Sequence, residues 1–372
     1  MPGKFEVAVI DLTSHCHPLA EQVEMARRYA AADIRIWLTD QTLNWWPDGL
    51  LEDAPIAREW RHAFWDRYVQ IGYLAACVPQ ARWAVALDVV RRRPDIIAQT
   101  CLTLQEFTGG RTFVALAAGE AKQLNPYGYE ESKPFTRLEE TVLALRRLWS
   151  GERFDFEGQT LHFRNAQQTL RAADGGTPPI STIGFAPRLR RIAAQHCEYA
   201  MVLGTQDEVR AQMATYREEA ERAGRDPATL KFWGSATRRP FHIMRWFTYE
   251  DEAEIGVLRK SPMCKFPALG GWLPTPNSPF GPDYHYAKDM VSTEWDKRRV
   301  MAVLDSVPDD AVPYEFLNED DMADWIVASV EVGIDMVRFT DRTPEIIPSR
   351  RKGHPDFWAR IVAKARRRLG AG

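Results

Sequence analysis

Residues 199–236, YAMVLGTQDEVRAQMATYREEAERAGRDPATLKFWGSA, contain a complete strand–helix–strand pattern. The pattern begins with an apolar run at 199–203 that has the length and composition of a buried strand. Thr205 and Glu208 then have the spacing of a capping box, which predicts a helix that continues to Ala223. Gly224 supplies a left-handed stop, and a second β-rich run follows at 231–236. This order is typical of a βαβ unit, whose two strands lie parallel in one sheet.

The same alternation continues in both directions along the chain. Apolar, β-rich runs are predicted to form strands at 5–10, 34–38, 83–87, 112–117, 179–183, 199–203, 231–236 and 335–340. Segments of helical period separate most of them, and one of these ends at Trp149-Ser150-Gly151. Eight strands favour closure into a (β/α)8 barrel, the TIM barrel, over an open doubly wound sheet. We therefore expect one α/β barrel domain spanning residues 1–372.

Residues 240–313 interrupt this rhythm between the seventh and eighth predicted strands. The segment is rich in proline and aromatic residues, and loops of this length are usually functional or disordered. Its aromatic content predicts an ordered insertion that packs over the barrel mouth.

Composition limits the classes of partner and compartment. The formal net charge of −3 gives no indication of a nucleic-acid or anionic-membrane partner. The arginine runs at 91–93 and 366–368 border helical patterns and are interpreted as solvated faces. No stretch approaches the ~20 apolar residues of a membrane span, and the first residues lack the pattern of a signal peptide. Five scattered cysteines without a CxxC pair indicate reduced thiols, so we expect a cytoplasmic protein.

Candidate site residues follow the predicted strands, because a parallel barrel carries its site at the carboxyl ends of the strands. They are His15 after the first strand, Asp40, Gln41 and Trp45 after the second, Gly119, Glu120 and Gln123 after the fourth, and Gly184, Ala186 and Arg188 after the fifth. No carboxylate lies at ligand spacing from His15, so a metal site is not expected.

Most of these residues have an ordinary structural alternative. Asp40 is either a helix cap or a hydrogen-bond partner of a cofactor ring, and Trp45 either packs in the core or stacks on a planar ligand. Glu120 is either a surface residue or an acid–base group, and Gly119 allows close approach of a ligand to the backbone. The turn from Gly184 to Arg188 precedes a helix, whose free N–H groups suit a phosphate.

Three segments carry a resemblance to a known family. They are Gly109-Gly110-Arg111 through Gly119-Glu120, Leu138-Glu139 through Leu148-Trp149-Ser150-Gly151-Glu152, and Phe154-Asp155-Phe156-Glu157-Gly158 through Phe163. In these segments the chain resembles the luciferase-like superfamily, and its nearest branch is the F420-dependent oxidoreductases. The stretch 119–123 with Pro126-Tyr127-Gly128, and the stretch 279–285, resemble phthiodiolone-type ketoreductases most.

The resemblance implies roles for individual positions. Asp40 matches a contact to the deazaflavin, Trp45 a tryptophan beside the reacting face, and Glu120 a proton donor or acceptor. Gln123 matches an amide near the cofactor, and Gly184 with Ala186-Pro187-Arg188 a turn that contacts the cofactor phosphate. Val85-Ala86 matches a strand bulge that holds a non-prolyl cis peptide behind the ring, at a cost of about 3–4 kcal/mol.

The chain departs from the family pattern at two of these positions. Gln41 stands in a catalytic position where many relatives have histidine, and glutamine cannot relay a proton. His15 is therefore an additional candidate for the proton donor. Ala186 replaces a glycine in the turn predicted to bind phosphate.

These observations predict an F420-dependent oxidoreductase that transfers hydride between the deazaflavin and a carbonyl, imine or activated double bond. The alternatives are an FMN-dependent luciferase-like monooxygenase and a non-catalytic flavin-binding barrel, which the loss of histidine at Gln41 favours. The expected partner is a small organic molecule, with apolar or polycyclic compounds favoured by the aromatic insertion. The resemblance also implies a homodimer.

Overall fold

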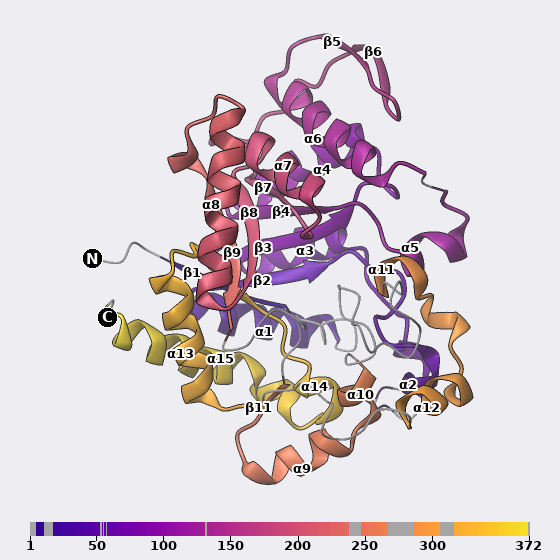
Figure 1. Ribbon diagram of the computed structural model, residues 1–372, viewed down its shortest axis with the longest axis vertical. Coiled ribbons are helices and arrows are strands. Elements are labelled where there is room, and N and C mark those ends of the chain that lie inside the picture. Colours follow the sequence, from indigo (N-terminus) through magenta and orange to yellow (C-terminus); the bar gives the residue numbers. More distant parts are fainter. Residues whose placement is uncertain are drawn as a thin grey trace.

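Eight parallel strands close into a barrel with the spatial order β1-β12-β9-β8-β7-β4-β3-β2 (Figure 1). The computed structural model describes residues 5–10, 18–52, 54, 56, 58–130, 132–237, 247–266, 286–305 and 316–370. The barrel strands are β1 (Glu6–Ile10), β2 (Ile34–Thr39), β3 (Arg82–Asp88), β4 (Thr112–Ala117), β7 (Ile180–Thr182), β8 (Tyr199–Gly204), β9 (Lys231–Ala236) and β12 (Met336–Phe339). All eight predicted strands, and with them the TIM barrel, are confirmed.

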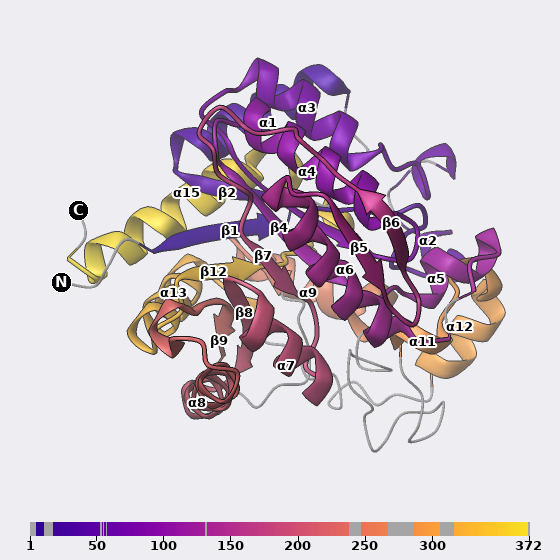
Figure 2. The same ribbon diagram turned by 90° about the horizontal axis from the view of Figure 1, so that it is seen from above.

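Helices surround the strands, as Figure 2 shows from above the barrel. They are α1 (Leu19–Ala31), α3 (Arg67–Cys77), α4 (Pro94–Phe107), α6 (Pro134–Ser150), α7 (Pro187–His196), α8 (Gln206–Arg222), α13 (Glu319–Glu331) and α15 (Arg350–Arg368). The predicted capping box at the start of α8 is present, because Glu208 donates its backbone N–H to Thr205 Oγ1 and accepts from the Thr205 N–H. Gly224 adopts the expected left-handed conformation at φ +73°.

Aromatic side chains fill the lower part of the barrel interior. The rings of Trp37 on β2 and Trp233 on β9 lie 4.8 Å apart between centroids, and Phe113 on β4 packs against Trp37 at 5.6 Å and Tyr199 at 5.2 Å. Trp37, Phe113 and Trp233 are fully buried. This layer fills the barrel interior beneath the carboxyl ends of the strands, where a parallel barrel carries its site.

The described parts of the insertion between β9 and β12 form a second apolar cluster with the loop after β2. This side of the molecule contains α2 (Asp48–Leu51), α9 (Glu252–Lys260), α10 (Pro262–Lys265), α11 (Tyr286–Asp289) and α12 (Lys297–Leu304) (Figure 1). The cluster includes Trp45, Trp46, Leu50, Met263, Phe266, Met290 and Trp295. Two hydrogen bonds join the segments: Ser292 Oγ donates to the Asn44 carbonyl at 2.5 Å, and the Gly49 N–H donates to the Trp295 carbonyl at 2.9 Å. The 279–285 stretch lies outside the described residues.

Two small sheets lie outside the barrel and were not predicted. Strands β5 (Phe154–Glu157) and β6 (His162–Ala166) form an antiparallel hairpin beyond α6, and β10 (Phe247–Thr248) pairs with β11 (Phe316–Leu317). Each strand has five residues or fewer. Such short runs do not show the alternation that distinguishes a strand from a loop.

Candidate functional site

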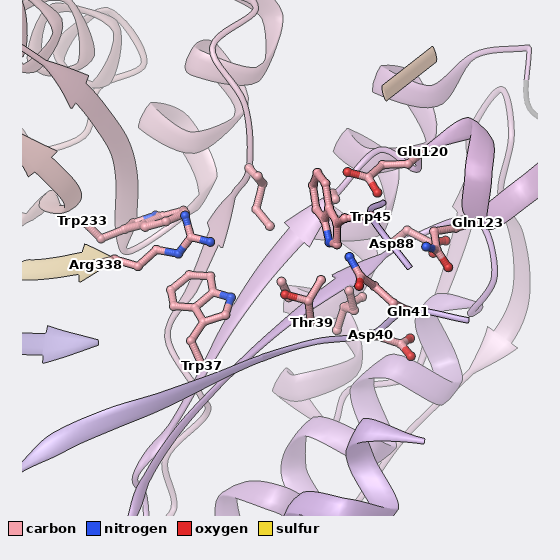
Figure 3. A pocket seen from close by; sticks show the side chains of 14 residues that line it. Trp37, Thr39, Asp40, Gln41, Trp45, Asp88, Glu120, Gln123, Trp233 and Arg338 are labelled. Atoms are coloured by element: carbon pink, nitrogen blue, oxygen red, sulfur yellow. The ribbon is translucent and has the colours of Figure 1, made fainter. Parts of the chain in front are cut away.

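A pocket opens at the carboxyl ends of the strands, where the barrel interior meets the following loops (Figure 3). It contains about 560 Å³ of space, counting the part open to solvent. Its lining residues are Trp37, Thr39, Asp40, Gln41, Trp45, Ala86, Leu87, Asp88, Ala117, Glu120, Gln123, Ile183, Trp233 and Arg338. Seven of these fourteen residues are aromatic or aliphatic, and the other seven are polar or charged, which suits a flat ligand that also makes several polar contacts. The pocket therefore brings together Asp40, Gln41, Trp45, Ala86, Glu120 and Gln123 of the predicted site residues.

An ion-pair network fixes the acidic side of the pocket. Arg91 Nη2 lies 2.9 Å from Asp40 Oδ2, and Arg91 Nε lies 2.5 Å from Asp88 Oδ2. Arg92 Nε lies 3.3 Å from Asp40 Oδ2, and the Arg92 guanidinium also stacks on the Tyr68 ring at 4.1 Å. Burial alone would lower the pKa of Arg91, but the charges of Asp40 and Asp88 outweigh it and raise that pKa. The carboxylate of Asp40 is thus held by two arginines.

The interpretation of the 91–93 run as a solvated face is therefore wrong for its first two residues. The Arg91 side chain is only 10% exposed, and that of Arg92 is 24% exposed. Arg91 also donates to the backbone carbonyl of Asp40 at 2.8 Å, which ties the end of β2 to the segment after β3. Asp88 lies only three residues before Arg91, but Asp40, which both arginines contact, is far away in sequence, so the run by itself gives no sign of this network.

Gln41 presents a hydrogen-bond donor without a protein acceptor. The residue is buried, and its Nε2 atom has no hydrogen-bond partner among the described residues. A buried amide N–H2 without an acceptor costs free energy, commonly about 1–3 kcal/mol. In Figure 3 this nitrogen lies beside Trp45 and faces the pocket. An acceptor atom on a bound ligand would satisfy it.

Glu120 and Trp45, with Lys122 behind them, form a second wall of the pocket. Lys122 Nζ donates to Glu120 Oε2 and lies 3.5 Å from the centroid of the Trp45 ring. Lys122 is fully buried, whereas Glu120 retains some exposure toward the pocket. Glu120 precedes α5 (Ala121–Leu124), so the start of this short helix positions the pair. The wall thus combines a carboxylate, an ammonium partner and an aromatic face.

Gln123 lines the pocket, and both atoms of its side-chain amide form hydrogen bonds with the loop after β2. Its Oε1 accepts from Thr42 N at 2.7 Å, Thr42 Oγ1 at 2.8 Å and Leu43 N at 3.4 Å. Its Nε2 donates to the Leu43 carbonyl at 2.9 Å. These contacts connect α5 to the segment that leads to Trp45. The structural role of Gln123 is to hold the loop after β2 through these hydrogen bonds. That Gln123 also binds the cofactor remains a prediction.

The predicted glycine positions adopt the backbone conformations that favour glycine. Gly119 has φ +106°, and a Cβ there would lie 2.8 Å from Leu124 Cδ1. Gly184 has φ +125°, and a Cβ there would lie 2.6 Å from Leu189 Cδ1. Both turns therefore need glycine at these positions.

The predicted phosphate turn lies at the start of α7, next to the pocket residue Ile183. Ala186 precedes the first residue of this helix. Arg188 Nη2 pairs with Glu139 Oε2 on α6 at 2.8 Å, and Arg188 is not part of the pocket lining. Phosphate binding by Gly184, Ala186 and Arg188 remains a prediction, with the backbone N–H groups of α7 as the available donors.

The structure tests the bulge and cis peptide bond predicted at Val85 and Ala86, but it does not test the role predicted for His15. The predicted bulge at Val85 and Ala86 is wrong, because β2 and β3 pair in unbroken register from Arg35↔Arg82 to Thr39↔Ala86. The cis peptide bond expected there is likewise absent, since all described peptide bonds are trans. Val85 is fully buried behind the pocket, and Ala86 lines it. His15 lies outside the described residues.

Sequence reasoning missed four side chains that shape the pocket: Trp37, Trp233, Lys122 and Arg338. Trp37, Trp233 and Arg338 lie within strands, so the search after strand ends passed over them. The available signal was Arg338 itself, a charged residue inside the apolar strand β12.

Among the described residues, no group of three or more His, Cys, Asp or Glu is arranged to hold a metal ion. No described helix combines the length and the apolar character that a membrane crossing requires.

Comparisons with known proteins agree with the barrel fold. A family model described as luciferase-like monooxygenase matches residues 6–238. The phthiodiolone/phenolphthiodiolone dimycocerosates ketoreductase of Mycobacterium bovis is 28% identical over 258 residues, which are 66% of this chain. The match spans 65% of that relative's own length, slightly less than two thirds.

Solved structures show the same fold at lower sequence identity. An F420-dependent secondary alcohol dehydrogenase in complex with an F420-acetone adduct has a TM-score of 0.72 at 17% identity, covering 98% of this chain and 99% of that one. A long-chain alkane monooxygenase has a TM-score of 0.68 at 15% identity, covering 99% of this chain and 92% of that one. The family model covers more than half of the chain, and the observed barrel agrees with it. The chain therefore belongs to the luciferase-like monooxygenase family.

Proposed function

We propose that this protein is an F420-dependent oxidoreductase that transfers hydride between the deazaflavin and a carbonyl, imine or activated double bond of an organic substrate. The pair of Glu120 and Lys122 at the pocket wall is the observation that carries the proposal. Hydride transfer to a carbonyl leaves an alkoxide that needs a proton. The carboxyl group of Glu120 at the pocket wall can act as the proton donor. The names of the ketoreductase relative and of the alcohol dehydrogenase with the same fold support this class of reaction.

The residues of the pocket fit a deazaflavin ring. The unpartnered Nε2 of Gln41 is a buried donor suited to a ring carbonyl oxygen, and Ala86 and Ala117 leave room for a flat system between the strands. The turn at 184–188 would hold the phosphate through the N–H groups of α7. When bound, the cofactor supplies a two-electron hydride donor or acceptor.

Each residue at the wall has a distinct task. The Glu120 carboxylate accepts a proton from a substrate alcohol or returns one to a forming alkoxide, and Lys122 holds that carboxylate in place through Oε2. Trp45 presents an aromatic face that excludes water and orients a planar substrate. Because three tryptophans and four aliphatic residues make up half of the lining, we propose substrates that present an apolar or aromatic body to the pocket.

Separate fluorescence titrations of the purified protein with F420 and with FMN test the proposal. We expect F420 to bind with a Kd on the order of 1 μM and FMN at least about tenfold more weakly. Reduced F420 should then be oxidised only when a ketone, imine or enone is added. Binding of F420 without turnover of any such compound would instead favour a non-catalytic barrel.

An FMN-dependent monooxygenase is the second candidate, supported by the family description and by the similar fold of the alkane monooxygenase. It predicts the opposite titration result, with FMN bound in preference and oxygen consumed when a reductant is supplied. Failure to bind either cofactor would exclude both candidates.

A further inference from the structure

Arg338 differs from the other charged residues that line the pocket. Asp40 and Asp88 are paired with Arg91, and Glu120 is paired with Lys122. Arg338 has no ion pair with any described residue, and its Nε has no hydrogen-bond partner among them. The pocket thus contains a positive charge whose neutralising partner the described part of the chain does not provide.

The surroundings of Arg338 direct it toward the ligand space. Its guanidinium carbon lies 4.8 Å from the Trp37 ring centroid and 5.7 Å from that of Trp233. Figure 3 shows the guanidinium between the two rings, pointing to the side of the pocket where Trp45 and Gln41 lie. Trp37 Nε1 is also buried without a described hydrogen-bond partner, and in Figure 3 it lies on the pocket side of its ring. Two kinds of donor, a guanidinium N–H and an indole N–H, therefore lie at one side of the pocket without a described hydrogen-bond acceptor.

The rings of Trp37 and Trp233 offset only part of the free energy lost when the Arg338 guanidinium leaves water. Contacts between a cation and a ring attract the charge, but they do not satisfy the N–H donors of a guanidinium. Burial, together with the nearby charge of Arg342, lowers the pKa of Arg338 to about 9. The group therefore remains protonated at neutral pH, and a partly buried cation without an ion pair is unfavourable there unless a ligand neutralises it.

We propose that Arg338 binds a carboxylate of the substrate, with Trp37 Nε1 as an additional donor, so that the substrate is an aromatic or apolar acid. The planar guanidinium matches a carboxylate through two parallel hydrogen bonds, which gives orientation as well as affinity. In Figure 3 Arg338 and Glu120 lie on opposite sides of the pocket. A substrate held by its acid group at Arg338 would present its other end to Glu120. The identity of the reacting group rests on the proposed function, whereas the anion site itself does not.

Calorimetric titration of the protein without cofactor tests the site directly, with benzoate and its neutral analogue benzamide as probes at pH 7. We expect the wild type to bind benzoate at least about tenfold more tightly than benzamide, as charge-assisted hydrogen bonds predict. Arg338→Met should reduce benzoate affinity to the level of benzamide, and Arg338→Lys should retain part of the preference. Arg217→Met is the matched control, because Arg217 stacks on the Phe232 ring from the exposed face of α8, away from the pocket.

Three results would overturn the proposal. They are equal affinity or no binding of both probes in the wild type, a benzoate preference that survives in Arg338→Met, and a loss of F420 affinity in Arg338→Met as large as the loss for benzoate. The last result would assign the anion to the cofactor. Thermal unfolding of Arg338→Met checks the fold, and we expect its Tm to equal or exceed that of the wild type. Failure of the wild type to bind F420 would contradict the proposed function alone and leave the benzoate comparison intact.

Discussion

At the scale of single residues, Glu120 is the group whose chemistry is easiest to isolate. Glu120→Gln keeps a hydrogen-bond acceptor for Lys122 but cannot carry a proton. We expect kcat to fall by about 10²–10⁴, the usual contribution of a general acid or base. The Kd for F420 should change by less than about threefold, because this substitution leaves the cofactor contacts in place. Steady-state kinetics and a fluorescence titration measure the two quantities, and a kcat close to wild type would remove Glu120 from the mechanism.

Gln41 gives a second residue-scale prediction, in which stability and binding change in opposite directions. Gln41→Leu removes a buried amide whose Nε2 lacks an acceptor, so the unfolding free energy should stay equal or rise by up to about 1 kcal/mol. The same change should weaken F420 binding by roughly tenfold if this nitrogen donates to the cofactor. Gln99→Leu on the exposed face of α4 is the control and should leave F420 affinity unchanged. Unaltered affinity in Gln41→Leu would leave the amide without a ligand role.

At the scale of elements, the loop after β2 depends on the short helix α5. Gln123→Leu removes four hydrogen bonds to Thr42 and Leu43 and leaves buried backbone groups unsatisfied. We expect a loss of about 2–4 kcal/mol of unfolding free energy. Amide hydrogen exchange at Thr42 and Leu43 should accelerate, whereas exchange at Val114 in β4 should follow only the global loss. Unchanged protection at Thr42 would show that the apolar cluster around Trp46 holds the loop without Gln123.

The strands of the barrel could be predicted from the sequence, whereas several residues of the pocket could not. Barrel strands are continuous apolar runs between amphipathic helices, so their positions and number follow from local pattern. Asp40, Gln41 and Glu120 were found because they follow strands. Lys122 and Arg338 were not found, because the contact of Lys122 with the distant Trp45 ring and the lack of an ion pair at Arg338 become visible only in the folded chain. The regular pairing of β3 at Val85 and the burial of Arg91 likewise depend on neighbouring strands and carboxylates.

At the scale of the whole molecule, a buried polar network joins the C-terminal helix to the barrel. Asp341 follows β12 and contacts His354 Nε2 on α15 at 3.1 Å, and it accepts from Thr248 Oγ1 on β10 at 2.7 Å. His354 Nδ1 lies 2.8 Å from the Tyr29 hydroxyl on α1. Burial alone would raise the pKa of Asp341, but its hydrogen bonds to His354, Thr248 and the Thr343 N–H outweigh burial and lower that pKa.

This network predicts how stability depends on pH. A carboxyl group whose pKa is lower in the folded state stabilises the fold above its unfolded pKa near 3.9, and this contribution is lost as pH falls through the folded pKa. Asp341→Asn should therefore reduce the unfolding free energy by about 3 kcal/mol at pH 7. The difference from wild type should shrink below about pH 4, because the wild-type carboxylate then becomes protonated. Asp356→Asn, which breaks an exposed pair with Arg28, should have little effect at either pH. Denaturant unfolding across this range measures the difference, and a constant gap between Asp341→Asn and wild type would show that the carboxylate charge does not contribute.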